Sequence, residues 1–142
     1  MDEQLRLAVI GVGALGRHHA RILSQMDGVK LVAVAEPREE QGQAVAESCG
    51  CDWTTDYRTL FGRIDAASVV VPTSMHRAVT ADLLQRSVPV LVEKPLAPTV
   101  EDGQLLVRLA AEHKVPLQVG HIERFNPAYQ EIAASCGAPR YV

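Results

Sequence analysis

Three closely spaced glycines near the N-terminus constrain the fold more than any other feature of the sequence. They stand in Gly11-Val12-Gly13-Ala14-Leu15-Gly16, which has the spacing G-x-G-x-x-G. The apolar run Leu5–Ile10 precedes them, as a buried strand would. A helical pattern follows, with an apolar face made of Leu15, His19, Ile22, Leu23 and Met26. A glycine loop between a strand and a helix predicts the first βαβ unit of a parallel sheet.

Further apolar runs rich in branched residues recur along the chain, at residues 30–35, 66–71, 88–92 and 116–119. Segments with helical spacing separate these runs. We therefore expect an α/β domain of the Rossmann type, in which a doubly wound parallel sheet carries helices on both faces.

The second half of the chain contains two further helix signals. Thr99 before Val100-Glu101-Asp102 resembles a capping box, and the helix it opens should present Leu106, Val107 and Ala110 on one side and end near residue 113. Asn126-Pro127 predicts a last helix that continues to Ala134. We expect residues 1–120 to form a dinucleotide-binding domain, and residues 121–142 to be a connecting helix and the start of a second domain.

The glycine loop is paired with an acidic residue at a characteristic distance. In such a loop the first glycine permits a tight turn, the second lets the backbone approach a pyrophosphate, and the third lets helix and strand pack closely. Glu36 stands 20 residues after Gly16, where dinucleotide-binding folds place the carboxylate that binds the adenine ribose. A carboxylate there repels the 2′-phosphate of NADP, so we expect NAD. Arg38 weakens this argument, since its guanidinium could pair with that phosphate or stack on adenine.

Composition and charge exclude several classes of function. The 142 residues have 47% apolar content, enough for one hydrophobic core, and a net charge of −3, so no excess of basic residues is available to neutralise nucleic acid. The N-terminus is acidic where a secretory signal is basic, and no apolar stretch is long enough to span a membrane. Cys49, Cys51 and Cys136 form neither a disulfide framework nor a C-x-x-C pair, which favours a reducing compartment, the cytoplasm.

Polar residues follow two of the expected strands at the point where each strand ends. Pro72-Thr73-Ser74-Met75-His76 follows one, and Glu93-Lys94-Pro95 follows the next. Ligands of open parallel sheets bind at the carboxyl ends of the strands, so we expect Thr73, His76, Glu93 and Lys94 to reach one crevice. Two alternatives remain open, namely that His76 is a solvated residue in a first helical turn and that Lys94 is an ordinary surface lysine.

Together these motifs resemble those of the glucose-fructose oxidoreductase and inositol dehydrogenase (Gfo/Idh/MocA) family. The resemblance covers essentially the whole chain and rests on the glycine loop, Val71-Pro72-Thr73 with His76, Glu93-Lys94-Pro95-Leu96, and Gly120-His121 with Arg124-Phe125-Asn126-Pro127. It implies an NAD-dependent oxidoreductase that transfers hydride between nicotinamide and a carbinol of a sugar, nucleotide sugar or cyclitol. The last of these motifs is similar to that of members acting on nucleotide sugars such as UDP-N-acetylglucosamine.

The resemblance also implies roles for particular residues. Lys94 is expected to contact both cofactor and substrate hydroxyl, and its ammonium group can stabilise the alkoxide that develops when a carbinol loses its proton and hydride. His121 and Arg124 are candidates for contact with substrate, and no metal is expected. The residues expected to bind cofactor are Gly11, Gly13, Ala14, Leu15, Gly16, Glu36, Arg38, Pro72, Thr73, His76, Glu93 and Lys94.

The sequence departs from the family in its length. The family's C-terminal domain, an antiparallel sheet with helices that covers the cofactor, has no counterpart in the 142 residues. We therefore expect the chain alone to bind cofactor but to lack a complete catalytic site. We also expect it to associate with itself, as a homo-oligomer, through apolar surface that such a domain would cover.

Two other interpretations compete with a dehydrogenase half. A stand-alone NAD-sensing module would explain the glycine loop but not Lys94, and a methyltransferase would explain neither Glu36 nor Glu93-Lys94-Pro95. The adjacent histidines His18 and His19 point about 100° apart on a helix, which disfavours a metal pair and favours a packed His19. Trp53 and Tyr57 are interpreted as packing residues.

Overall fold

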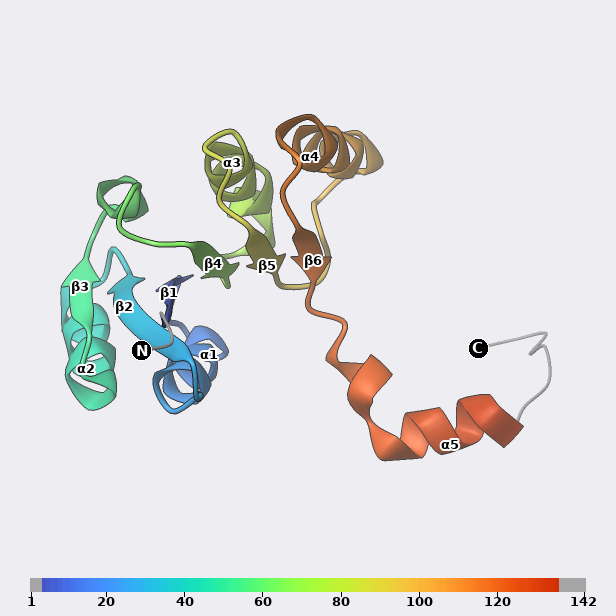
Figure 1. Ribbon diagram of the computed structural model, residues 1–142, viewed down its shortest axis with the longest axis horizontal. Coiled ribbons are helices and arrows are strands. Elements are labelled where there is room, and N and C mark those ends of the chain that lie inside the picture. Colours follow the sequence, from blue (N-terminus) through green and yellow to red (C-terminus); the bar gives the residue numbers. More distant parts are fainter. Residues whose placement is uncertain (1–3, 136–142) are drawn as a thin grey trace.

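The computed structural model describes residues 4–135 as a six-stranded sheet with helices on both faces (Figure 1). In chain order the elements are β1 (Leu5–Ile10), α1 (Gly16–Ser24), β2 (Val29–Ala35), α2 (Glu39–Cys49), β3 (Asp52–Thr54), the 3-10 helix η1 (Tyr57–Leu60), β4 (Ala66–Val69), α3 (Thr73–Leu84), β5 (Val90–Val92), α4 (Val100–His113), β6 (Leu117–Val119), the 3-10 helix η2 (Ile122–Phe125) and α5 (Pro127–Ser135).

The sheet has the order β3-β2-β1-β4-β5-β6, and each neighbouring pair is parallel. The chain builds outward from β1 to one side and then from β4 to the other, so the order reverses between these two central strands. Helices α1 and α2 cover one face, and α3 and α4 cover the other (Figure 1). This arrangement confirms the doubly wound Rossmann fold, in which ligands bind at the carboxyl ends of the strands beside the reversal.

The central strands are apolar because helices cover them on both sides. Ala8, Val9 and Ile10 of β1 are almost fully buried. The core under α3 and α4 is the larger one and contains bulky leucines, among them Leu83 and Leu106. The core under α1 and α2 is built mostly of valine and alanine. The first helix therefore lies against small side chains, close to the strands that hold the glycine loop.

Five strands follow the predicted apolar runs, with ends that differ by one or two residues. The strand β4 ends at Val69 rather than at residue 71, because the chain turns there toward α3. The sequence did not predict β3, which pairs with residues 33–35 of β2 through only three residues. Such a short edge strand, with Trp53 as its one large apolar residue, is too short to show a periodic pattern.

Helix α1 buries a different face from the one the sequence predicts. Its buried residues are Gly16 and Ala20, and Leu23 is partly packed behind them. Ile22 and Met26, which were expected on the buried face, are about half exposed. The reason is the close approach of the helix to the sheet, which admits a glycine and an alanine at the contact and leaves no room there for longer side chains.

Helix α4 begins and ends where the sequence predicts. The Thr99 hydroxyl accepts a hydrogen bond from the amide of Asp102 at 3.2 Å, which confirms the cap, and the helix ends at His113. Its buried face is formed by Leu106, Leu109 and Ala110. Val107 lies outside that face and is 57% exposed, contrary to the expected grouping.

The segment after β6 leads away from the sheet. Figure 1 shows α5 lying beyond the edge strand, and every residue from 121 to 135 is exposed. The apolar side chains of Ile122, Phe125, Tyr129 and Ile132 are among them, with Phe125 76% exposed. Within residues 4–135, no helix has the length and apolar character needed to cross a membrane.

These exposed apolar side chains lead to a prediction about association. We expect a polypeptide of residues 1–142 to self-associate, because several large apolar side chains exposed along one short segment are usually covered by another surface. Replacing Phe125 and Ile132 together by serine should shift the protein toward monomer in light scattering. Val107→Ser, which removes an exposed apolar residue elsewhere, is the matched control and should change little. A monodisperse wild-type monomer at high concentration would contradict the prediction.

Replacing either of two helical glycines by alanine should change the stability of the protein, but in opposite directions. A Cβ atom at Gly42 in α2 would overlap the indole of Trp53, whereas one at Gly103 in α4 would meet only Leu96, at 3.7 Å. We expect Gly42→Ala to lower stability by about 1–3 kcal/mol through overpacking. Gly103→Ala should raise it by up to about 1 kcal/mol through helix propensity. Thermal melts of both variants test this, and a stabilising Gly42→Ala would show that the contact with Trp53 is wrong.

Candidate functional site

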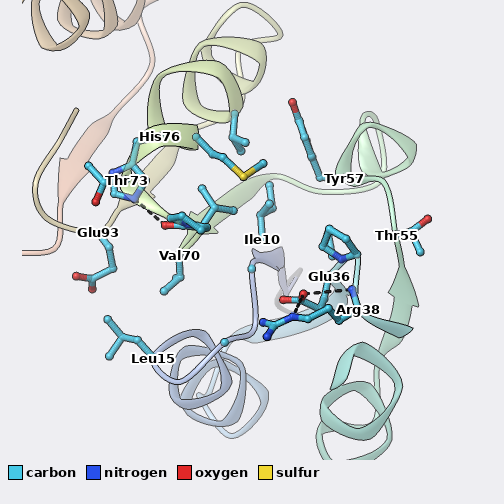
Figure 2. A pocket seen from close by; sticks show the side chains of 18 of the residues that line it. Ile10, Leu15, Glu36, Arg38, Thr55, Tyr57, Val70, Thr73, His76 and Glu93 are labelled. Atoms are coloured by element: carbon cyan, nitrogen blue, oxygen red, sulfur yellow. Dashed lines mark hydrogen bonds and ion pairs between the residues drawn. The ribbon is translucent and has the colours of Figure 1, made fainter. Parts of the chain in front are cut away.

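A cavity of about 650 Å³ lies at the carboxyl ends of the central strands. Figure 2 shows it extending between Glu36 and Arg38 at one end and Thr73, His76 and Glu93 at the other. The glycine loop and Leu15 at the start of α1 form a third side. The residues that line the cavity are Ile10, Gly11, Gly13, Leu15, Ala35, Glu36, Pro37, Arg38, Thr55, Tyr57, Val70, Val71, Pro72, Thr73, Met75, His76, Val79, Glu93 and Lys94.

An added side chain would meet different surroundings at each of the three glycines of the loop. Gly11 has a φ of +85°, and a Cβ atom there would lie 2.7 Å from the carbonyl oxygen of Val70. A Cβ atom at Gly16 would overlap the carbonyl of Gly11, so α1 could not approach the loop. A Cβ atom at Gly13 would meet only a guanidinium nitrogen of Arg38, 3.8 Å away. The fold therefore needs Gly11 and Gly16, while Gly13 leaves open space beside the cavity.

Glu36 is buried at the end of β2 and is held by several hydrogen bonds. Its Oε2 accepts from the amide of Val12 at 3.1 Å, and its Oε1 accepts from the Arg38 amide at 3.2 Å and Nε at 2.9 Å. Burial by itself raises the pKa of Glu36. The hydrogen bonds from Arg38 and Val12, together with the Arg38 charge, lower the pKa by more, so the net pKa lies below the usual range. The carboxylate is thus ionised at neutral pH and faces the cavity as a fixed acceptor.

Residues that the sequence did not identify as site residues hold this end in place. The Trp53 indole donates a hydrogen bond to the carbonyl oxygen of Glu36 at 3.0 Å, and the Gln41 side-chain amide donates to the carbonyl oxygen of Val12. Trp53 therefore packs, as predicted, and also fixes the backbone that carries Glu36. The spacing of the motif gave no signal for either contact.

The wall between the two ends also contains residues that sequence reasoning missed. Thr55, Tyr57 and Met75 line the cavity, and Figure 2 shows Tyr57 along its side. The Tyr57 hydroxyl donates to Asp82 at 2.7 Å. Burial and that carboxylate raise the pKa of Tyr57 to about 12, so the phenol stays neutral. Its interpretation as a packing residue was incomplete, and its distance in sequence from the glycine loop explains why no motif included it.

The opposite end of the cavity brings together the residues that follow β4 and β5. Thr73, His76, Glu93 and Lys94 all line it, which is the convergence that the strand ends predict. His76 is only 1% exposed, so the alternative of a solvated first-turn histidine is wrong. Glu93 is also buried, whereas Lys94 is exposed at the rim. The ammonium group of Lys94 is thus available to a molecule in the cavity.

Four of the predicted site residues do not line the cavity. Ala14 is exposed at the glycine loop, and Gly16 is buried beneath it. His121 and Arg124 are exposed on the segment after β6, where the Arg124 guanidinium lies 3.4 Å from Nδ1 of His121. The structure therefore brings these two residues together, but neither is among the residues that line the cavity.

The histidines and cysteines set aside as metal or redox sites have other surroundings. His19 is partly buried, and its ring contacts Ser68 and Glu93 rather than apolar side chains alone, which corrects the expectation of simple packing. Cys49 and Cys51 are free thiols. Burial, with smaller contributions from Cys49 and Asp52, raises the pKa of Cys51 to about 11, so it is not a reactive thiolate. Cys136 lies outside the described residues.

The arrangement is suited to a long ligand with an anionic centre. A fixed carboxylate can accept hydrogen bonds from ribose hydroxyls at one end. The N-terminus of α1 and the open backbone at Gly13 can receive a pyrophosphate in the middle. An ammonium group stands at the other end, as a reaction at an alcohol oxygen requires. These three features fit a nicotinamide dinucleotide.

Comparison with known proteins agrees with this geometry. Residues 5–121 match the Gfo/Idh/MocA family model, described as an oxidoreductase family with an NAD-binding Rossmann fold. Among curated proteins, the chain is 37% identical over 139 residues to UDP-N-acetylglucosamine 3-dehydrogenase of Acidithiobacillus ferrooxidans and 35% identical over 150 residues to scyllo-inositol 2-dehydrogenase (NAD(+)) of Bacillus subtilis. These alignments cover 97% and 99% of this chain, but 44% of each relative, so the chain spans less than half of their length.

Solved structures show the same relationship. The Acidithiobacillus ferrooxidans enzyme superposes with a TM-score of 0.89, covering 97% of this chain and 46% of that one. Scyllo-inositol dehydrogenase from Lactobacillus casei, solved with bound NAD(H) and scyllo-inositol, superposes with a TM-score of 0.85 over 93% of this chain and 41% of that one. At 21% identity the second likeness concerns the fold alone.

Proposed function

The chain belongs to the Gfo/Idh/MocA family of oxidoreductases, and from this premise we propose that it is the cofactor-binding half of an NAD-dependent dehydrogenase. Its substrate is a carbinol of a sugar, nucleotide sugar or cyclitol. The observation that carries the proposal is that Glu36, the glycine loop and Lys94 all line one cavity. Residues 1–120 are the dinucleotide-binding domain, and residues 121–142 connect it with a substrate domain. The cytoplasm is the expected compartment.

Each end of the cavity has a separate task in this proposal. Glu36 holds the adenine ribose, and Gly13 admits the pyrophosphate to the N-terminus of α1. A nicotinamide dinucleotide, when bound, supplies the group that accepts or donates hydride. Lys94 lies beside the substrate oxygen and stabilises the alkoxide that develops as the carbinol loses its proton.

The substrate class rests on the relatives and on the cavity together. One relative is named for a nucleotide sugar and another for an inositol, and both substrates offer secondary alcohols. His121 and Arg124 remain candidates for substrate contact, on the exposed segment that leads away from the sheet. The alternative of a binding module without catalysis is less favoured, because it assigns no role to an ammonium group at the rim of the cavity.

Mapping by NMR tests the proposed site. Titration of NADH into ¹⁵N-labelled protein should shift the amides of the glycine loop, of Glu36 and of Lys94. AMP, which has only the adenosine half, should shift those near Glu36 and leave Lys94 unchanged. Shifts confined to residues outside the cavity, or an AMP response at Lys94 as large as that at Glu36, would contradict the proposed site or its orientation.

A further inference from the structure

We propose that His19 and His76 are positioning residues that hold the turn Glu93-Lys94-Pro95 from two sides and so fix the place of Lys94 at the cavity. This inference rests on the proposed function, because it takes Lys94 as the residue that meets the nicotinamide end of the cofactor. The two histidines belong to different helices, α1 and α3, which lie on opposite faces of the sheet (Figure 1). The turn between them follows β5.

On the first side, His19 connects helix α1 with the carboxylate of Glu93. Its Nε2 lies 3.3 Å from Oε1 of Glu93, and its Nδ1 lies 2.8 Å from the hydroxyl of Ser68. A neutral ring with its proton on Nε2 satisfies both contacts, since it donates to the carboxylate and accepts from the hydroxyl. His19 is therefore able to hold Glu93 without carrying a charge itself.

Glu93 in turn contacts the backbone of the next residue, Lys94. Its other oxygen, Oε2, accepts a hydrogen bond from the backbone amide of Lys94 at 3.2 Å. Gly120 leaves room for this carboxylate, since a Cβ atom there would lie 2.8 Å from Oε1. A buried carboxylate that contacts His19 through one oxygen thus holds the Lys94 amide through the other, and the direction of that amide sets where the lysine side chain begins.

On the second side, His76 joins the ends of two loops. Its Nδ1 lies 2.8 Å from the carbonyl oxygen of Pro95, and its Nε2 lies 2.9 Å from the carbonyl oxygen of Val71 (Figure 2 shows the second contact). Both partners are acceptors, so a neutral ring, which has one N–H, donates to one of the two carbonyls, and the protonated ring donates to both. The ring lies between the turn after Lys94 and the loop after β4, and its contact with Pro95 is a hydrogen bond when Nδ1 carries the proton.

Lys94 itself has no other restraint within the part of the chain that the structure describes. Its amino group makes no hydrogen bond or ion pair there, and the residue is exposed. Its place is therefore set through the backbone on either side, by Glu93 before it and Pro95 after it. Removing either histidine should leave the lysine present but less well placed for a ligand at that end.

The test compares two ligands that differ only at the end in question. NADH reaches the Lys94 end, whereas ADP-ribose contains the adenosine and pyrophosphate without the nicotinamide. In His19→Ala and His76→Ala we expect the affinity for NADH to fall about tenfold, the effect of losing one or two buried hydrogen bonds. The affinity for ADP-ribose should stay at the wild-type value. His18→Ala, which changes an exposed neighbour on the same helix, is the matched control.

Conservative variants separate positioning from a general structural effect. A glutamine amide reaches where Nε2 of histidine lies, and an asparagine amide reaches where Nδ1 lies. His19→Gln should therefore keep the contact with Glu93 and retain NADH affinity, whereas His19→Asn should lose it. For His76 the order is reversed, because the contact with Pro95 is made by Nδ1. These variants also keep the test decisive if an alanine variant fails to fold.

A measurement without cofactor separates this inference from the proposed function. Hydrogen exchange at the Lys94 amide, followed by NMR in the free protein, should become about tenfold faster in His19→Ala than in His18→Ala. If wild-type protein binds neither NADH nor ADP-ribose, the proposed function is wrong whatever the exchange rate shows. If wild type binds both ligands, equal losses for the two ligands in the variants, or unchanged NADH affinity, overturn the positioning role.

Discussion

Replacing Gly13 by valine is expected to abolish measurable binding of NADH and to leave the folded protein intact. Gly13 is the one glycine of the loop where an added side chain meets open space, with Arg38 at 3.8 Å as its nearest neighbour. That space is where a pyrophosphate would approach the backbone. Loss of two charge-assisted hydrogen bonds, each contributing about 1.5–3 kcal/mol, would weaken binding by a factor of about 100 or more.

Calorimetry with NADH and a thermal melt of the same sample test this prediction. The informative control is Gly16→Ala, since a Cβ atom there overlaps the carbonyl of Gly11 and should lower the melting temperature itself. The two glycines are three residues apart and should fail in different ways, one in binding and the other in folding. A Gly13→Val variant that binds NADH as wild type does would show that the loop is not the pyrophosphate site.

The second large effect is expected in catalysis. A polypeptide of residues 1–142 should bind cofactor and yet turn over no sugar, cyclitol or nucleotide sugar at a useful rate. The structure offers Lys94 at the rim, but the two histidines nearby face other partners: His76 lies between two carbonyl groups, and the partly buried His19 contacts Glu93. Neither is placed to accept the substrate proton.

The size of this effect follows from what orientation and proton transfer contribute. Holding a substrate in place supplies about 7–11 kcal/mol of barrier reduction, and a general base adds a factor of about 10²–10⁴. Formation of NADH, followed by absorbance with a panel of alcohols and with Lys94→Ala as the control, tests the prediction. Clear turnover that disappears in Lys94→Ala would show that the residues present already make a complete site.

The sequence predicts the fold well wherever a local rule determines the structure. The glycine spacing placed the turn after β1, and the Thr99 cap placed the start of α4, because both depend on a few neighbouring residues. It failed where packing decides. Helix α1 presents Gly16 and Ala20 to the sheet because the approach is close, and no pattern of apolar residues along the helix could reveal this.

The candidate site was predicted in part for the same reason. Glu36 and Lys94 follow strands, and the topology of a parallel sheet brings such residues to one edge. Tyr57 and Trp53 belong to a strand and turn too short to predict, so their contacts with the site could not be inferred. His121 stands after the last strand, yet it is exposed and is not among the residues that line the cavity. A position in sequence therefore identified the edge of the sheet, but not the direction of a side chain.

Calorimetric titration of the protein with NADH and NADPH under identical conditions tests the central claim most directly. The ionised, buried carboxylate of Glu36 should favour NADH by about tenfold or more, since a 2′-phosphate would meet its negative charge. The Arg38 Nε already donates to that carboxylate at 2.9 Å, so the carboxylate partly neutralises the charge that Arg38 would present to a phosphate. Binding of NADH in preference to NADPH is the predicted result. Binding of neither dinucleotide, or equal or tighter binding of NADPH, would contradict the account.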